Sequence, residues 1–249
     1  MPVYVITGAS RGLGLEWVRQ LSQIAQNTII AAVRTTSPIP SSLASLVARP
    51  SPSIIHILQC DVGDSSSVAN FGNSIRAVLG TDDIDDSRIT KIDYLINNAG
   101  MSTPQPHPNS LGLEADDLAM HMNVNVVGPA RVVPALLPYM RRGSRIINIS
   151  SALGSKTHTL GMPYSVHTAY SISKAALNML SVHQALDLRV YGIIVVTLDP
   201  GWVKTDLTEG EHAPMKAEES VVGMLKTIHR LDENDSGRFF TFSGHESAW

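Results

Sequence analysis

The sequence of 249 residues contains one cysteine, few aromatic residues and no run of basic residues. A single cysteine, Cys60, excludes an internal disulfide and a cysteine-based metal site, and it fits a reducing compartment. We expect Cys60 to be a small, buried apolar side chain. The 19 basic and 22 acidic residues are scattered along the chain and give a net charge of −3. This balance predicts no nucleic-acid partner.

Long apolar stretches are also absent. No window of about 18 apolar residues could cross a membrane, and the first expected strand begins at about Pro2, which leaves no room for a signal peptide. We therefore expect a cytoplasmic protein with no membrane partner. The nine histidines do not occur at HxH, HxxxH or HExxH spacing, so we expect no metal site.

Seven short runs of mainly β-branched and other apolar residues alternate with longer segments of helical pattern. Strands that are covered by helices on both faces have this nearly continuous apolar composition. The pattern predicts an α/β fold: a Rossmann-type, doubly wound parallel sheet of about seven strands with helices on both faces, in a single domain over residues 1–249. The runs are residues 3–7, 28–33, 53–58, 93–97, 145–150, 193–198 and 238–242.

Three glycines follow the first expected strand in quick succession, at Gly8, Gly12 and Gly14. Gly8 permits a tight turn, Gly12 lets the backbone approach a pyrophosphate, and Gly14 lets the next helix pack closely on the sheet. The N-terminus of that helix would offer free N–H groups and a positive dipole end to phosphates. The stretch predicts a phosphate-binding turn, although glycines between a strand and a helix are weak evidence alone.

Later motifs strengthen this interpretation. Together with the glycines, they resemble the short-chain dehydrogenase/reductase superfamily over nearly the whole chain. Within it, LDPGWVKTD, AALNML and the ending SGRFFTFSGHESAW most resemble the sniffer-like and C-factor-like carbonyl reductases, although that branch often has histidine at the position of Asp199. The motifs are TGASRGLG (7–14), CDV (60–62), NNAG (97–100), NVVG (125–128), YSISK (170–174) and PGWVKTD (200–206).

Tyr170 and Lys174 lie four residues apart, so on a helix they share one face. An ammonium beside a phenol favours the phenolate, and we therefore expect the pKa of Tyr170 to be lowered toward neutrality. Tyr164 is a competing tyrosine, but four residues after it stands Thr168 instead of a lysine. The tyrosine and lysine could also form an ordinary exposed contact on a helix.

The resemblance implies four catalytic residues. Tyr170 would donate a proton to a carbonyl oxygen, and Ser151 would hydrogen-bond the same oxygen. Lys174 would lower the pKa of the tyrosine and hold the nicotinamide ribose, and Asn125 would hold a water that links the lysine to solvent. Ser150 competes with Ser151, but the spacing to the following glycine selects Ser151.

Charge indicates which nicotinamide cofactor the chain binds. An NAD enzyme places an acid after its second strand, whereas this chain has Arg34 there. Arg34 can pair with a 2′-phosphate, and Arg11 adds a second cation beside the glycines. We therefore predict NADPH/NADP+, with two merely solvated arginines as the alternative. The implied cofactor-binding residues are Gly8, Ser10, Arg11, Gly12, Leu13, Gly14, Arg34, Asp61, Val62, Asn98, Ala99, Gly100, Tyr170, Lys174, Pro200, Gly201, Val203 and Thr205.

Two loops are expected to form the walls of a substrate site, at about residues 155–168 and 202–217. The first makes the separation of Ser151 and Tyr170 longer than in many relatives, so it could line a partly apolar pocket or simply bulge at the surface. The second begins with Trp202 and could be a mobile lid or an ordinary loop.

These expectations combine into an NADPH-dependent reductase that converts a small or medium hydrophobic ketone or aldehyde into an alcohol. The alternatives are an NADP+-dependent alcohol dehydrogenase and a non-catalytic NADPH-sensing or scaffold protein on the same fold. The resemblance also implies a homodimer or tetramer formed through the helices around Asn125 and Tyr170, although their apolar positions could instead be core. Pro134 should kink the first of these helices or shift a hydrogen bond.

Overall fold

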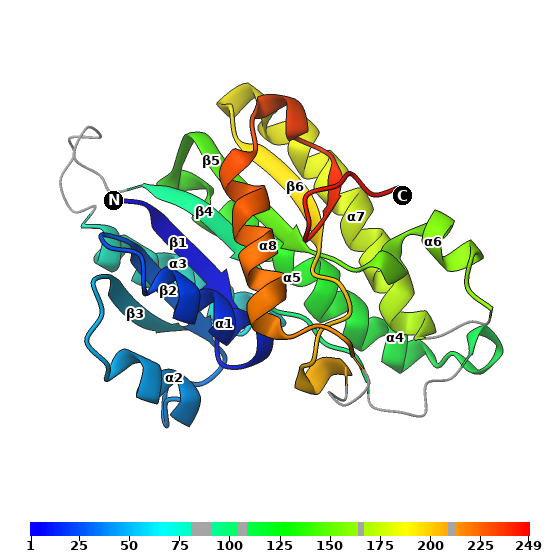
Figure 1. Cartoon of the computed structure of the whole chain (residues 1–249), viewed down its shortest axis with the longest axis horizontal. Coiled ribbons are helices and arrows are strands. Elements are labelled where there is room, and N and C mark those ends of the chain that lie inside the picture. Colours follow the sequence, from blue (N-terminus) through cyan, green and yellow to red (C-terminus); the bar gives the residue numbers. More distant parts are fainter. Residues whose placement is uncertain (81–90, 104–108, 164–166, 209–212) are drawn as a thin grey trace.

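The computed structural model describes residues 1–80, 91–103, 109–163, 167–208 and 213–249. Within these residues, seven strands form a sheet in the order β3-β2-β1-β4-β5-β6-β7, and all neighbouring strands are parallel (Figure 1). This confirms the predicted Rossmann-type sheet. The strands are β1 (Val3–Thr7), β2 (Thr28–Val33), β3 (Ile54–Gln59), β4 (Ile92–Asn97), β5 (Met140–Ile149), β6 (Ile194–Asp199) and β7 (Phe239–Thr241).

The strand β5 differs most from its prediction, because it begins at Met140 instead of Arg145. The intervening residues, MRRGS, have no apolar pattern that would predict a strand. They join the sheet through Ser144, whose hydroxyl donates to the carbonyl oxygen of Ile92 over 2.6 Å. The register between β4 and β5 shifts at this point. A contact between distant segments therefore sets this end of the strand.

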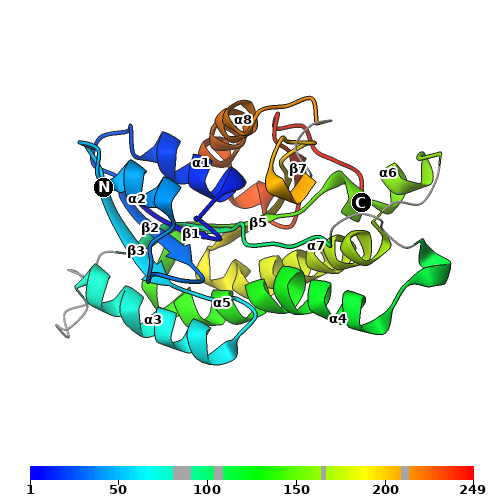
Figure 2. The ribbon, with the colours of Figure 1, turned by 90° about the horizontal axis from the view of Figure 1, so that it is seen from below.

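Helices cover both faces of the sheet. In the edge-on view, α1 (Gly12–Leu21), α2 (Ser41–Val47) and α8 (Ala217–Arg230) lie on one side, and α3 (Ser65–Leu79), α4 (Ala115–Met122), α5 (Gly128–Leu136) and α7 (Thr168–Leu188) lie on the other (Figure 2). The short α6 (Lys156–Leu160) lies near the end of the chain (Figure 1). The arrangement is the one that right-handed crossovers between parallel strands produce.

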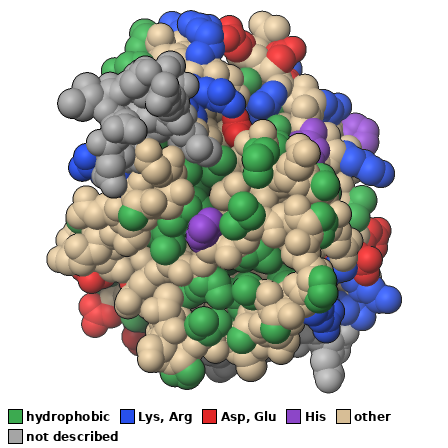
Figure 3. Space-filling model, turned by 90° about the vertical axis from the view of Figure 1, so that its left-hand side faces the viewer, with side chains coloured by type: hydrophobic (Ala, Val, Ile, Leu, Met, Phe, Trp, Pro, Cys, Tyr) green, Lys and Arg blue, Asp and Glu red, His purple; other side chains and the backbone are tan. Residues whose placement is uncertain are grey.

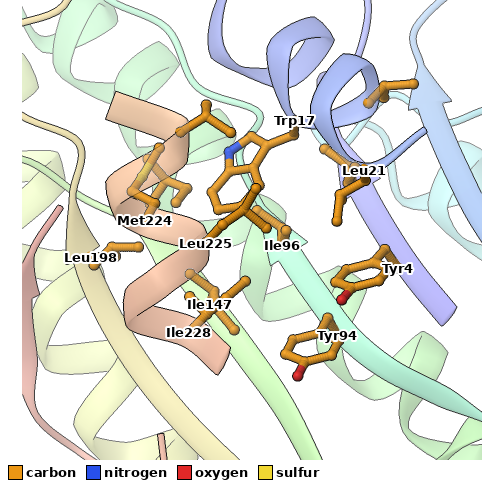
Figure 4. Close-up of a cluster of buried hydrophobic side chains, with 14 of the residues drawn as sticks. Tyr4, Trp17, Leu21, Tyr94, Ile96, Ile147, Leu198, Met224, Leu225 and Ile228 are labelled. Carbon is orange, nitrogen blue, oxygen red and sulfur yellow. The ribbon is translucent and has the colours of Figure 1, made fainter. Parts of the chain in front are cut away.

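Two buried clusters hold these layers together. On one face, Trp17 of α1 and Met224 of α8 pack with Ile96 of β4 (Figure 4). On the other face, Phe71 of α3 packs in a cluster with Leu95. Because successive side chains of a strand point to opposite faces, the neighbours Leu95 and Ile96 serve different clusters. Burying one such side chain contributes roughly 1.5–3 kcal/mol to stability.

Cys60 lies in the second cluster and is 3% exposed, and burial raises the pKa of its thiol to about 12. The prediction of a small, buried apolar residue is confirmed. Among the described residues, no helix combines the length and the apolar composition needed to cross a membrane. Among the same residues, no group of three His, Cys, Asp or Glu side chains lies close enough together to hold a metal ion.

Figure 3 shows the side of the molecule that lies on the left in Figure 1. Hydrophobic side chains gather in the middle of this face, and most of the charged ones lie toward its rim. The edge strand β3 lies on this side, and its first residue, Ile54, is exposed. The candidate site described next lies instead where the strands end.

Candidate active site

The carboxyl ends of the parallel strands lie along one edge of the sheet, and the residues that follow them are those that the sequence analysis singled out. Gly8 follows β1, Asn98 follows β4, Ser150 follows β5 and Pro200 follows β6. Open parallel sheets bind their ligands outside this edge. The topology therefore brings together predicted site residues from the whole chain.

The turn after β1 is tight enough to require glycine. Gly8 has a φ of +68°, and a Cβ there would lie 2.8 Å from the Cα of Ala99. A Cβ on Gly14 would lie 2.1 Å from the carbonyl oxygen of Gly8. The helix α1 begins at Gly12, and Arg11 at its N-cap makes no side-chain hydrogen bond to the first turn. The N–H groups of that turn are therefore available to an anion.

Hydrogen bonds tie this turn to the end of β4. The hydroxyl of Thr7 accepts from the backbone N–H groups of Asn98 and Ala99 over 3.1 and 3.0 Å. The side-chain amide of Asn98 donates to the carbonyl oxygens of Thr7 and Gly8 over 3.0 and 3.3 Å. Sequence reasoning missed Thr7, whose only signal was its place at the end of the first strand, directly before the glycines.

The two predicted cations are exposed at the same edge of the sheet. Arg34 directly follows β2. Arg11 lies 3.4 Å from the carboxylate of Asp206, and both side chains are about two-thirds or more exposed, at 68% and 72%. An exposed pair of this kind contributes roughly 0–1 kcal/mol, so it does not hold Arg11 away from another anion. Asp61 and the buried Val62 follow β3.

Asn125 lies in a π-helical turn, Asn123–Val127, between α4 and α5. The N–H group that closes the turn donates to the carbonyl oxygen of Asn123, five residues back. Pro129 has no N–H to offer the carbonyl group of Asn125, four residues before it, which favours the wider turn. The helix α5 then continues through Pro134. The π-helical turn therefore lies before Pro129, whereas the sequence predicted a distortion at Pro134.

The side chain of Asn125 is buried and makes three hydrogen bonds, which leave one acceptor position on its oxygen. Its oxygen accepts from the N–H of Met101 over 2.8 Å, and its nitrogen donates to the Met101 carbonyl over 3.0 Å and to the Ser173 hydroxyl over 2.9 Å. A Cβ on Gly100 would lie 3.4 Å from the Asn125 oxygen and 3.6 Å from Nζ of Lys174. Sequence reasoning missed Ser173, although its place directly before the lysine was a signal.

The two adjacent serines after β5 have different surroundings. Ser150 is buried, and its hydroxyl donates to the side-chain oxygen of Asn178 over 2.6 Å. Ser151 is half-buried, and its hydroxyl accepts from the N–H of Leu153 over 3.2 Å. Its side chain also lies near enough to Tyr170 to lower the pKa of the phenol. The structure therefore brings Ser151 to the tyrosine and engages Ser150 elsewhere.

Tyr170 and Lys174 face each other on α7. Nζ of Lys174 lies 5.5 Å from the centre of the tyrosine ring and donates to the carbonyl oxygen of Ile149 over 2.8 Å. Burial lowers the pKa of Lys174 to about 8. The rings of His121 and His167 meet the Tyr170 ring edge-on, with centroids 6.4 and 6.5 Å away. Neither histidine was predicted to lie against the tyrosine ring.

The expectation that the pKa of Tyr170 is lowered is wrong. Burial raises this pKa above its ordinary value of 10.0, the nearby side chain of Ser151 opposes the rise, and the charge of Asp199 adds to it. The lysine nitrogen lies over the ring and is itself less readily charged, so it does not reverse the effect. A phenol that keeps its proton at neutral pH can serve as a proton donor.

Asp199 is the last residue of β6 and is 8% exposed. Its carboxylate accepts from the N–H of Gly201 over 3.1 Å, and the backbone of Ala152 lies near enough to lower its pKa. Burial raises the pKa of Asp199, while these two backbone groups and His158 oppose the rise. The residue therefore joins the turn that carries Ser151 to the loop after β6.

The second predicted substrate loop begins with an ordered segment. Val203 forms a parallel bridge with Met215, and the N–H of Thr205 donates to a threonine hydroxyl three residues later over 3.2 Å. Trp202 is 58% exposed. Residues 209–212 of this loop lie outside the described part of the chain.

The first predicted substrate loop contains α6. The hydroxyl of Ser155 caps this helix by accepting from the N–H of His158 over 3.0 Å. His158 and Leu160 are exposed. His167 precedes α7 in a left-handed conformation, with a φ of 48°. Tyr164, the competing tyrosine, lies outside the described residues.

Known proteins are similar to this chain in sequence and in fold. The sequence model of the short chain dehydrogenase family matches residues 2–216. The C-signal protein of Myxococcus xanthus is 42% identical over 162 residues, which cover 64% of this chain and 93% of that protein. An NADPH-bound carbonyl reductase from chicken fatty liver has a TM-score of 0.87 at 30% identity, and the carbonyl reductase Sniffer of D. melanogaster has 0.87 at 29%. Each similarity covers 100% of both chains.

Proposed function

Because the chain belongs to the short-chain dehydrogenase family, we propose that it is an NADPH-dependent reductase that converts a small or medium hydrophobic ketone or aldehyde into an alcohol. One observation carries the proposal: Tyr170 lies beside Lys174 and close enough to Ser151 for the serine to lower its pKa, at the sheet edge that also holds the glycine turn. The similarity to two carbonyl reductases, one of them with NADPH bound, supports the same activity.

The residues at this edge fit NADP(H). The first turn of α1 at Gly12 would hold the pyrophosphate, and Arg11 and Arg34 would pair with the 2′-phosphate. Gly100 has no side chain beside Nζ of Lys174, so a ribose held by the lysine would approach its backbone closely. The bound cofactor supplies a hydride. The further proposed contacts are Gly8, Ser10, Leu13, Gly14, Asp61, Val62, Asn98, Ala99, Pro200, Gly201, Val203 and Thr205.

The chain's own residues place the carbonyl group and move one proton. Tyr170 donates its phenolic proton to the carbonyl oxygen, and the hydroxyl of Ser151 donates a hydrogen bond to the same oxygen. The charge of Lys174 stabilises the phenolate that remains. Asn125 holds a water beside the lysine, through which the proton returns to Tyr170.

The raised pKa of Tyr170 supports reduction as the working direction. Reduction requires the protonated phenol, which this pKa maintains at neutral pH. Alcohol oxidation requires the phenolate, which is scarce at the same pH. A protein that only sensed NADPH would have no use for a tyrosine held between a serine and a lysine.

The outward face of α7 supports a homodimer. Ile172, Met179 and Leu186 are spaced by seven residues, so they share one helix face, and they are 41%, 60% and 54% exposed. A second copy of the chain would cover this apolar stripe. A cytoplasmic location also stays a prediction.

The test is consumption of NADPH and NADH by the purified protein with aliphatic, aromatic and quinone carbonyls, with Tyr170→Phe measured in parallel. Oxidation of NADPH that depends on Tyr170 is the expected result. Tight NADPH binding without turnover of any carbonyl would favour the sensor instead. The panel would also show the size of carbonyl that the site accepts.

A further inference from the structure

The segment that follows β7 doubles back along that strand. Phe240 forms an antiparallel bridge with Glu246, and the N–H of Ser247 donates to the carbonyl oxygen of Phe239 over 2.7 Å. The C-terminal end then lies beside the segment that leads to α6, in both views of the ribbon (Figures 1 and 2). The sequence motif SGRFFTFSGHESAW thus ends next to the first substrate loop.

The last residue binds that loop directly. The carbonyl oxygen of Trp249 accepts from the N–H of Thr157 over 3.1 Å and from its hydroxyl over 2.7 Å. The indole ring stacks on Phe239 of β7, with centroids 5.4 Å apart and an angle of 28° between the planes. Thr157 lies in the first turn of α6, a few residues after Ser151. Trp249 therefore connects the central sheet to the wall beside the serine.

The start of the same segment touches the other wall. A Cβ on Gly201 would lie 3.2 Å from the ring of Phe242 and 3.2 Å from the terminal methyl group of Met215. Phe242 and Met215 therefore both lie against Gly201, in the loop that follows β6. A Cβ on Gly223 would lie 2.9 Å from the same phenylalanine ring, so the ring also rests on α8.

The turn between these two contacts is anchored independently of the site. Arg230 of α8 donates to the carbonyl oxygen of Gly244, whose φ is +84°. The N–H of Thr241 donates to the carbonyl oxygen of His245 over 2.9 Å. Arg238 and Glu246 form an ion pair at 3.3 Å. The segment is thus held by α8 and β7 along its length.

We propose that residues 242–249 form a brace between the two substrate walls, and that Trp249 is a positioning residue which determines the size of the substrate. The proposal rests on the proposed carbonyl reductase function. Both hydrogen-bond donors of Thr157 bind one carbonyl oxygen, so the first turn of α6 cannot move outward without losing both bonds. A large hydrophobic ketone needs this wall in place, whereas a small aldehyde reaches Ser151 and Tyr170 without it.

The kinetic test compares Trp249→Ala and Thr157→Val with Ser247→Ala. The control removes an exposed hydroxyl from the same segment and keeps its backbone pairing. In the first two variants, we expect kcat/KM for a bulky aromatic ketone to fall roughly tenfold, mainly through KM, because Trp249→Ala removes the ring that stacks on Phe239 and Thr157→Val removes the hydroxyl that binds the main-chain oxygen of Trp249. We expect kcat/KM for a small aliphatic aldehyde and the Kd for NADPH to stay within about twofold. An equal loss with both carbonyls, or no loss, would overturn the proposal.

Hydrogen exchange tests the brace without any turnover. We expect the amides of residues 152–160 to exchange faster in Trp249→Ala than in the wild type, while those of α3 do not change. Unchanged exchange over residues 152–160 would overturn the brace whatever the kinetics. If exchange rises but the wild type reduces no carbonyl, the brace stands and the proposed function fails.

Discussion

The side-chain amide of Asn125 donates to the hydroxyl of Ser173 over 2.9 Å, and this hydroxyl donates in turn to the carbonyl oxygen of Tyr170 over 2.7 Å. The asparagine proposed to hold a water is therefore oriented by the residue directly before Lys174. Ser173 was not predicted to be catalytic, yet it orients the side chain of Asn125, which was.

Ser173→Ala should lower kcat and leave KM nearly unchanged. Removing the acceptor leaves the Asn125 side chain with only its two hydrogen bonds to Met101, and one hydrogen bond of this kind is worth about 1 kcal/mol, so we expect a loss of roughly fivefold. Ser181→Ala is the matched control, because Ser181 is equally buried on α7 and also hydrogen-bonds an asparagine, Asn148. Equal losses of kcat in both variants would mean that only the packing of α7 matters.

Tyr170→Phe should abolish turnover and leave the NADPH affinity within about threefold of the wild type. The change removes the proton donor and keeps the ring that lies against Lys174. Steady-state rates and fluorescence titration with NADPH measure the two effects separately. Retained turnover would show that another group donates the proton.

Arg34→Asp should weaken NADPH binding far more than NADH binding, because a carboxylate at this position repels a 2′-phosphate and can accept from a ribose hydroxyl. Kd values for both cofactors provide the comparison. Arg189→Asp makes the same charge change on an exposed residue after α7 and should alter neither value. Equal weakening of both cofactors by Arg34→Asp would show that Arg34 does not contact the phosphate.

Gly100→Ala should weaken NADPH binding, whereas Gly14→Ala should destabilise the fold. A Cβ on Gly100 would lie 3.4 Å from its nearest neighbour, so the protein should fold normally, with an unchanged Tm, and bind NADPH more weakly. A Cβ on Gly14 would lie 2.1 Å from a carbonyl oxygen, so that variant should lose stability outright. Thermal unfolding and NADPH titration separate the two effects. Unchanged NADPH affinity in Gly100→Ala would contradict the proposed ribose position.

Asp199→Asn should move the alkaline limb of the reductase pH profile to lower pH. The negative charge of Asp199 raises the pKa of Tyr170, and its removal lets the phenol lose its proton at lower pH, while reduction needs the protonated form. Asparagine keeps an oxygen for the N–H of Gly201. The measurement is kcat/KM against pH, with Asp187→Asn, an exposed residue of α7, as the control.

A limb that stays at the wild-type pH would mean that Asp199 does not govern it. In that case Lys174, whose pKa is lowered to about 8, would be the group that sets the limb. A limb that moves to higher pH would contradict the sign of the charge effect.

The local sequence was sufficient to predict the sheet and the edge at which the candidate site residues lie. Strands that are buried on both faces are apolar along most of their length, so β1 and β6 could be predicted from nearly continuous apolar runs. Parallel strands all end at one edge, so motifs that follow the first, fourth, fifth and sixth strands had to meet there. The spacing of Tyr170 and Lys174 likewise determined that they share a helix face.

Only the tertiary structure determined the pKa values of these residues and the distant contacts that hold them in place. The pKa of Tyr170 is raised because burial and the charge of Asp199 outweigh a lysine four residues away, and neither effect is visible in local spacing. The contact between Thr157 and Trp249 joins residues 92 positions apart. Periodicity and turn chemistry act over a few residues, whereas desolvation and long-range hydrogen bonds depend on which distant segments the fold brings together.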